Sequence, residues 1–259
     1  MTDKLDLKSA LEQLKLGKFL ANYEEIASEC EARNASHLDF LLALCEQELE
    51  HRHTKRLAKL LKAAKLPRTK TLDDFDHKRI PGLKLSQIQI LAQGDFLDRA
   101  ENLLMFGNPG TGKTHLCLSL AQEWCMQGRK VLYTTVATVI QTLLKAKKEL
   151  TLERCIKRYD KYQALIIDDI TYGSCERAEA DVLFTLLSER YEMRSTIITS
   201  NEPFANWNKI FQDETTTNAA IDRLVHHSTI LELNAESYRL STAKKKKQTK
   251  ENTTKKEVN

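Results

Sequence analysis

Eight consecutive residues have the types and the spacing that bind phosphate groups. They follow the pattern G-x-x-x-x-G-K-T and are Gly107, Asn108, Pro109, Gly110, Thr111, Gly112, Lys113 and Thr114. Glycines let successive backbone N–H groups surround a phosphate, and a lysine at this position adds a point charge to the β- and γ-phosphates. The threonine hydroxyl at the end of the pattern is a ligand for Mg²⁺. The segment therefore predicts a site for a nucleoside triphosphate.

Two carboxylates and an amide follow further apolar runs and extend this chemistry. Asp168 and Asp169 end the run 164–167, and Asn201 ends the run 195–200. We expect Asp168 to hold the Mg²⁺ shell with Thr114, and Asp169 to orient and deprotonate an attacking water. Asn201 would position that water by hydrogen bonding. The alternatives are acids that merely end a buried strand and an asparagine in a turn.

An arginine on a later helical pattern is a candidate finger for the γ-phosphate bound by a neighbouring subunit. This residue is Arg223, and a surface salt bridge with Asp222 or Glu232 is the alternative. His226 and His227 end the same pattern, and we interpret them as packing and surface groups because no partner spacing supports a metal. Rivals for interface or sensor roles are Arg190, Arg194 and Arg239, of which Arg239 follows the last predicted strand and is a candidate nucleotide contact.

Alternating strands and helices must position these residues. The apolar runs predict strands at 102–106, 130–135, 164–168, 195–200 and 229–233, and helices at 112–127, 136–148, 151–161, 177–193 and 217–226. Such alternation is typical of an α/β fold in which a parallel sheet has helices on both faces. Ligands of these sheets bind at the carboxyl ends of the strands, where the polar residues above are expected.

Residues 1–66 have a helical pattern instead, and one end of it is strongly basic. Gly17 predicts a break, and Ser36 with Asp39 forms a capping-box pattern ahead of a helix that runs toward Leu66. No Asp or Glu lies between positions 52 and 70. The basic stripe, expected on one face of this helix, consists of Arg52, Lys55, Arg56, Lys59 and Lys62. It predicts a polyanion partner, with a merely solvated face as the alternative.

The remaining composition bounds the class of protein. The 259 residues carry a net charge of +4, and six cysteines form no C-x-x-C pair, so we expect reduced thiols in a cytoplasmic protein. The sequence has no run of membrane-spanning length and no signal-peptide pattern. We predict a helical domain with a polyanion-binding end at 1–66, a linker with a lead-in helix at 67–101, a domain for the nucleoside triphosphate at 102–240 and a disordered basic tail at 241–259.

The order of these motifs resembles the AAA+ ATPases, and within them the IstB-type helper ATPases of bacterial insertion sequences. The DnaC-type helicase loaders are similar but more distant. The segments that carry the likeness are Phe106–Leu116, Leu183–Glu192, Ile198–Asn201 with Trp207, and Asp222–His227 with Ser237–Arg239. The resemblance implies a three-layer αβα domain with a five-stranded parallel sheet, preceded by a small all-α domain.

The same resemblance implies roles for individual residues. The nucleotide and Mg²⁺ residues are Lys113, Thr114 and Asp168, with His115 beside them; Asn201 is the sensor, and Arg223 is the finger. The family usually has Asp-Glu where this chain has Asp168-Asp169. A shorter carboxylate lies about 1 Å further back, and misplacement of that order costs about 10²-fold in rate. The loop 171–175 also departs from the family pattern.

The sequence thus predicts an ATP- and Mg²⁺-dependent ATPase that assembles as a homo-oligomer, a ring or a helical filament, on duplex DNA and assists a transposase. A helicase loader, whose N-terminal helices would bind a protein, is the alternative. A scaffold that binds ATP without turnover is a third hypothesis, suggested by Asp169.

Overall fold

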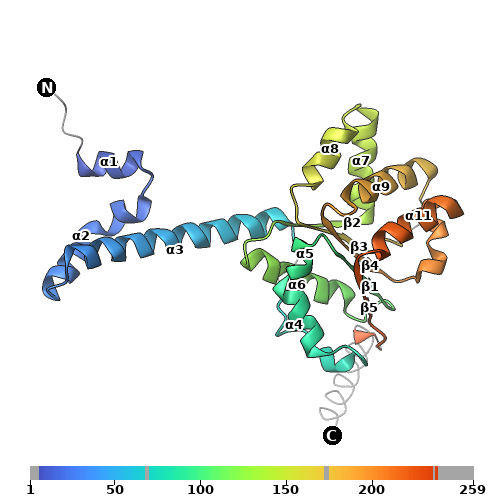
Figure 1. Cartoon of the computed structure of the whole chain (residues 1–259), viewed down its shortest axis with the longest axis horizontal. Helices are drawn as coiled ribbons and strands as arrows, with labels where there is room; N and C mark the ends of the chain where they lie inside the picture. The colour runs from blue at the N-terminus through green and yellow to red at the C-terminus, as the bar shows by residue number, and fades with distance from the viewer. Residues whose placement is uncertain (1–5, 68–69, 172–174, 236, 239–259) are drawn as a thin grey trace, which may run out of the picture. The chain divides into compact units, whose positions relative to one another are not determined.

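The chain begins with helices alone and changes to alternating strands and helices from residue 102 onward (Figure 1). This computed structural model describes residues 6–67, 70–171, 175–235 and 237–238. Contacts divide the chain into two compact units, Met1–Lys59 and Leu60–Asn259. None of the described helices has the length and apolar character needed to cross a membrane.

The first unit consists of helices that bury a small apolar centre. They are α1 (Leu7–Gln13), α2 (Gly17–Ala32) and the first part of α3 (His37–Ala64). Leu11, Ile26 and Leu44 are its buried apolar side chains. The capping box ahead of α3 is confirmed, because the Asp39 carboxylate accepts from the backbone N–H of Ser36 at 3.0 Å while the Ser36 hydroxyl accepts from the Asp39 N–H at 3.2 Å.

The second unit is built on a five-stranded parallel sheet of order β2-β3-β4-β1-β5. The strands are β1 (Asn102–Phe106), β2 (Val131–Thr135), β3 (Ala164–Asp168), β4 (Ser195–Ser200) and β5 (Ser228–Glu232). Each lies within one residue of the strand predicted from the sequence. The order places β3, β4 and β1 side by side, so their polar carboxyl ends meet.

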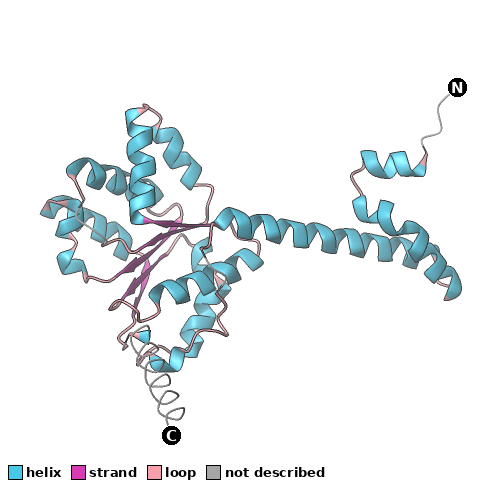
Figure 2. Cartoon of the chain, turned by 180° about the vertical axis from the view of Figure 1, so that it is seen from behind, coloured by secondary structure: helices cyan, strands magenta, loops and turns pink. Residues whose placement is uncertain are grey.

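Helices cover both faces of the sheet, which gives the expected three-layer α/β fold (Figure 2). One face carries α4 (Leu85–Gln93), α5 (Asp95–Asp98) and α6 (Lys113–Met126). The other carries α7 (Val136–Lys148), α8 (Leu152–Tyr159), α9 (Arg177–Arg190), α10 (Asn208–Phe211) and α11 (Glu214–Val225). Short 3₁₀ turns, η1 (His77–Arg79) and η2 (Phe204–Asn206), lie in the connections.

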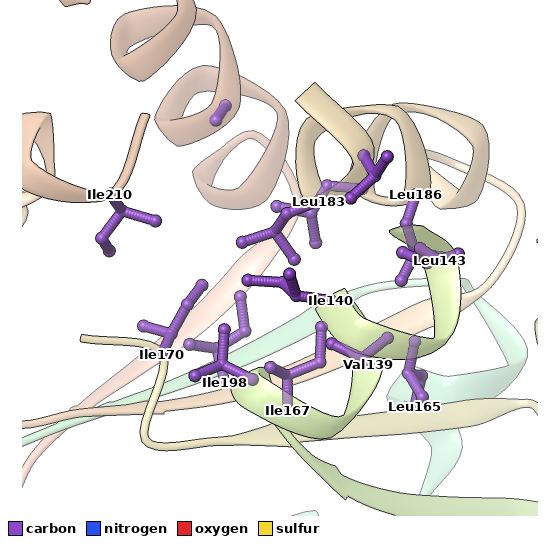
Figure 3. Close-up of a cluster of buried hydrophobic side chains, with 14 of the residues drawn as sticks. Val139, Ile140, Leu143, Leu165, Ile167, Ile170, Leu183, Leu186, Ile198 and Ile210 are labelled. Carbon is purple, nitrogen blue, oxygen red and sulfur yellow. The ribbon is translucent and has the colours of Figure 1, made fainter. Parts of the chain in front are cut away.

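Alternation along the strands divides the apolar core between the two faces. Ile167 of β3 and Ile198 of β4 point to the α7–α9 side, whereas Ile166 and Ile197 point to the α6 side. Figure 3 shows Ile167 and Ile198 together with side chains of α7 and α9 in the first of these clusters. A parallel sheet buried on both faces needs such continuous apolar strands.

Helix α8 is three residues shorter than predicted, and α9 and α11 each have one end three residues from its predicted position, for local reasons. Helix α9 ends at Arg190, because Glu192 adopts the left-handed conformation (φ 59°) in the turn before β4. Helix α11 begins at Glu214, because the Asp213 side chain accepts a hydrogen bond from the backbone N–H of Thr216 at 2.7 Å. An N-cap of this kind fixes where a helix starts.

Candidate active site

The glycine-rich segment forms the loop between β1 and α6, and its glycines are sterically required. Gly107 and Gly110 have φ angles of 151° and 85°. A Cβ at Gly107 would lie 2.5 Å from the backbone oxygen of Leu233, whose own N–H donates to the Phe106 carbonyl at 2.8 Å. The chain after β5 therefore closes one side of the loop, and only glycine fits there.

Lys113, the first residue of α6, is 6% exposed and is held by oxygens of the loop itself. Its Nζ donates to the Gly107 carbonyl at 2.6 Å, to the Asn108 carbonyl at 3.0 Å and to Asn201 Oδ1 at 2.6 Å. The ammonium charge is thus already positioned against the loop, where phosphate oxygens would compete for it.

Asp168, at the end of β3, accepts hydrogen bonds from three other elements. Thr114 Oγ1 of α6 lies 3.1 and 3.2 Å from its two carboxylate oxygens, Tyr133 Oη of β2 lies 2.7 Å away, and Thr199 Oγ1 of β4 lies 2.5 Å away. The hydroxyl of Thr114 and this carboxylate are hard oxygen donors of the kind that Mg²⁺ prefers. Next to the glycine loop, they fit a magnesium nucleotide.

Asn201 joins the second carboxylate to the lysine. Its Nδ2 donates to Asp169 Oδ1 at 2.7 Å, while its Oδ1 accepts from Lys113. Asp169 adopts the left-handed conformation (φ 57°), and its N–H donates to Thr199 Oγ1 at 2.8 Å. Burial and the neighbouring Asp168 charge raise the pKa of Asp169, and the Lys113 charge opposes them. A carboxylate with a raised pKa is suited to accept a proton from water.

The comparisons with known proteins agree with this geometry. Residues 9–247 match the family described as IstB-like ATP binding protein. The chain belongs to this IstB-like family.

Relatives of the IstB-like chain cover nearly its whole length. It is 40% identical to an insertion-sequence ATP-binding protein of Sinorhizobium fredii, over 93% of this chain and 81% of that protein. It is 37% identical to the IS21 ATP-binding protein of Pseudomonas aeruginosa, over 96% of this chain and 94% of that protein. Its family and these relatives thus identify the chain as an ATP-binding protein of the insertion-sequence type.

Solved structures show the same fold at low sequence identity. The DnaC helicase loader matches with a TM-score of 0.53 and 17% identity, over 63% of this chain and 96% of that chain. AMPPCP-bound DnaA from Aquifex aeolicus matches with a TM-score of 0.55 and 19% identity, over 70% of this chain and 55% of that chain. The AAA+ fold of the IstB-like chain is thereby confirmed.

Two residues of the site were missing from the sequence prediction. The hydroxyls of Tyr133 and Thr199 both donate hydrogen bonds to Asp168. Burial raises the pKa of Tyr133, and its hydrogen bond to Asp168 raises that pKa further. Polar residues near the ends of the predicted strands 130–135 and 195–200 were visible in the sequence. Tyr133 and Thr199 reach Asp168 because β2 and β4 lie on either side of β3 in the sheet. The positions of the strands along the sequence do not predict this order.

The segment after β5 and the segment before β1 meet next to the glycine loop. The Tyr238 N–H donates to the Gly110 carbonyl at 3.0 Å, and the Arg79 guanidinium lies 4.8 Å from the centre of the Tyr238 ring. His115 packs edge-on against Phe75, and burial lowers its pKa. Arg239 and the tail 241–259 lie outside the described residues, as do positions 172–174 of the variant loop.

The arginine candidates have different environments. The Arg223 guanidinium lies 5.2 Å from the centre of the Phe184 ring and donates to the Ala219 carbonyl at 2.9 Å. Arg194 donates to two backbone carbonyls and is exposed. Arg190 is 1% exposed, and its guanidinium donates to Thr196 Oγ1 and to the backbone carbonyls of Tyr159, Tyr162 and Ser195. An interface role for Arg190 is wrong, because its donors are used inside the core.

All five residues of the basic stripe are exposed on α3. Arg52 differs from the others, because its Nε donates to the buried Glu48 at 2.7 Å and its guanidinium also donates to the Lys15 carbonyl at 2.8 Å. This arginine therefore fixes the α1–α2 connection to α3. Lys55, Arg56 and Lys59 extend from the helix without such a bond among the interactions described.

Proposed function

We propose that this IstB-like protein hydrolyses ATP as an oligomer on duplex DNA and remodels that DNA for a transposase. The observation that carries the proposal is the continuous network Lys113–Asn201–Asp169 beside the Asp168–Thr114 pair. A protein that only binds a nucleotide needs the loop and the lysine. Hydrolysis also needs a group that orients or deprotonates the attacking water, and Asp169 and Asn201 are suited to that task.

The residues divide the work of hydrolysis as follows. Thr114 and Asp168 would hold Mg²⁺, which when bound neutralises charge on the β- and γ-phosphates. Lys113 exchanges the loop carbonyls for phosphate oxygens and keeps its charge in place. Asp169 accepts the proton of the attacking water, and Asn201 fixes the direction of that carboxylate. Because aspartate is shorter than the usual glutamate, we expect slow turnover.

The assembly would share this site between subunits. Arg223 lies on α11 beside Asp222 and is partly exposed, and its side chain contacts the Phe184 ring and the Ala219 carbonyl. Both contacts are weak compared with a phosphate, so the guanidinium is available for the γ-phosphate of a neighbour. ATP would then favour the oligomer, and hydrolysis would release it.

The basic stripe would track the DNA backbone without reading sequence. Exposed lysines and arginines without intervening acids bind phosphates by releasing counterions, and each phosphate contact contributes a slope of about −0.9 in log affinity against log salt. Binding through Lys55, Arg56 and Lys59 therefore predicts a steep salt dependence.

Charge reversal of these three residues tests the DNA interface. In the variant Lys55→Glu/Arg56→Glu/Lys59→Glu, duplex DNA binding by fluorescence anisotropy should fall to the background at 150 mM salt, while ATP binding is unchanged. Arg52 stays intact because it holds the helical unit together. The matched control is Lys145→Glu/Lys148→Glu on α7, which should retain DNA affinity. DNA affinity that survives the first reversal would refute this interface.

Electron microscopy of the protein with ATP and duplex DNA tests the oligomer. Rings or filaments should form with ATP and DNA and should be lost in Arg223→Ala, although this variant still binds ATP. Monomers alone at low salt, with both ligands present, would refute the shared site.

A further inference from the structure

A second polar cluster lies at the opposite edge of the sheet, where the strands begin. Glu192 lies in the turn between α9 and β4, and His226 and His227 lie between α11 and β5. Strands β4 and β5 flank β1 on either side. The two turns are far apart in sequence but adjacent in the sheet.

A buried asparagine keeps these two turns together. Asn102, the first residue of β1, is 7% exposed. Its Oδ1 accepts from the Thr196 N–H at 2.9 Å and its Nδ2 donates to the Leu224 carbonyl at 3.0 Å. Its own N–H donates to the His227 carbonyl at 2.7 Å. The backbones that carry the cluster are therefore fixed by bonds within the sheet.

The three side chains converge without bonding one another. Glu192 Oε1 lies 3.8 Å from His226 Nδ1 and 3.9 Å from His227 Nε2, and one donor atom from each residue lies within 4.8 Å of the other two. Those distances are longer than the donor–acceptor distance of a hydrogen bond. Donors around a tetrahedral zinc ion lie about 3.3–3.5 Å apart, given bonds of about 2.0–2.2 Å. Rotations of exposed side chains would close the difference.

We propose that Glu192, His226 and His227 form a binding site for one divalent cation of the zinc class. Two imidazole nitrogens with one carboxylate oxygen match the donor set of zinc sites that keep an open fourth position. Magnesium and calcium prefer oxygen donors, so this site is chemically distinct from that of Asp168. From the sequence, His226 and His227 are interpreted as packing and surface groups because no third ligand lies near them along the chain. The fold supplies that ligand, Glu192.

Metal binding there would exchange the hydrogen bonds of Tyr191 to His226 and Glu192 for coordination. The Tyr191 hydroxyl lies 2.6 Å from His226 Nδ1, so a cation at that nitrogen displaces it. The side chains of all three ligands are about half exposed, so no buried group has to be uncovered. A bound ion would link the turn before β4 to the end of α11, the helix that carries Arg223.

Zinc titration of the full chain tests the site. Protein stripped with EDTA and free of nucleotide and DNA is titrated with Zn²⁺ against a competing chelating dye. We expect the wild type to bind one ion that His226→Ala/His227→Ala loses, with affinity at least 10-fold weaker in Glu192→Gln. The matched control is His51→Ala/His53→Ala, which removes two exposed histidines of α3 and should bind as the wild type does.

Thermal unfolding provides a second, independent measurement. Zn²⁺ should raise the Tm of the wild type and of the control by mass action, and should leave the Tm of the His226/His227 variant unchanged. Equal zinc affinity in the wild type and that variant, or no binding by the wild type, overturns the proposal. Equal Tm values in EDTA and unchanged ATP binding show that the variant is folded, and neither measurement depends on ATP hydrolysis or DNA.

Discussion

The carboxyl edge of the sheet and the basic stripe of α3 use charge in opposite ways. At the sheet edge, Lys113 and Asp168 are nearly fully buried and each makes several short hydrogen bonds to fixed neighbours. On α3, Lys55, Arg56 and Lys59 are exposed. The first region is a preorganised site for one small ligand, and the second is a surface for a long polymer.

The difference predicts how each region tolerates substitution. A buried network fails as a unit, because removing one member leaves another unsatisfied. Exposed cations act almost independently and through a field that salt screens. Single substitutions should therefore have large effects at the sheet edge and small, additive effects on α3.

The largest effect is expected for Asp169→Asn. The asparagine still accepts from Asn201 but takes no proton from water, so turnover should fall by about 10²–10⁴-fold. Nucleotide affinity should change little. Phosphate release with and without duplex DNA measures this. Turnover equal to that of the wild type would mean that another group is the base.

The same carboxylate predicts the pH profile of hydrolysis. A base acts when deprotonated, so the rate should rise with pH through the pKa of Asp169. Burial and the Asp168 charge raise that pKa, so the rising limb lies above pH about 4, where an ordinary aspartate titrates. Rates measured at constant ionic strength should show this limb in the wild type and lose it in Asp169→Asn.

Lys113→Ala comes next in size. A charged hydrogen bond to phosphate contributes about 1.5–3 kcal/mol, so affinity for a fluorescent ATP analogue should fall about 10- to 100-fold. The loss also frees Asn201 from one of its two partners. Lys145→Ala, an exposed lysine of α7, is the control and should bind as the wild type does. A loss below about 3-fold would contradict a role of Lys113 in phosphate binding.

The glycine loop could be predicted from the sequence because its residues are consecutive. Other parts of the site depend on the order of the strands in the sheet and could not be predicted in this way. The loop occupies consecutive residues, so sequence alone gives its elements and its lysine. Asp168, Asp169 and Asn201 follow from apolar runs that end in polar residues. Tyr133 depends on which strand borders β3, and the buried state of Arg190 depends on carbonyls of three segments. No periodicity contains that information.

A moderate effect on ATP affinity is expected for Tyr133→Phe at the carboxyl ends of the strands. It removes one hydroxyl from Asp168, and a hydrogen bond of this kind contributes about 0.5–1.5 kcal/mol. We expect ATP affinity to fall about 2- to 10-fold in Mg²⁺ and to stay constant in EDTA, because the hydroxyl orients only the carboxylate assigned to the metal. Tyr162→Phe is the matched control. An equal loss in EDTA would indicate a packing defect instead.

The smallest effects are expected on α3, where Lys59 and Arg52 of the basic stripe should respond differently to substitution. Lys59→Gln should reduce the magnitude of the salt slope of DNA binding by about 0.9 and leave unfolding in urea unchanged. Arg52→Ala leaves the buried Glu48 with one partner fewer, at a cost of roughly 1 kcal/mol, moderated because the arginine itself is half exposed. A loss of stability in Arg52→Ala would show that Arg52 is part of a fixed hydrogen-bond network, as Lys113 and Asp168 are, although it lies on α3. Equal stability of the two variants would place it with the exposed cations.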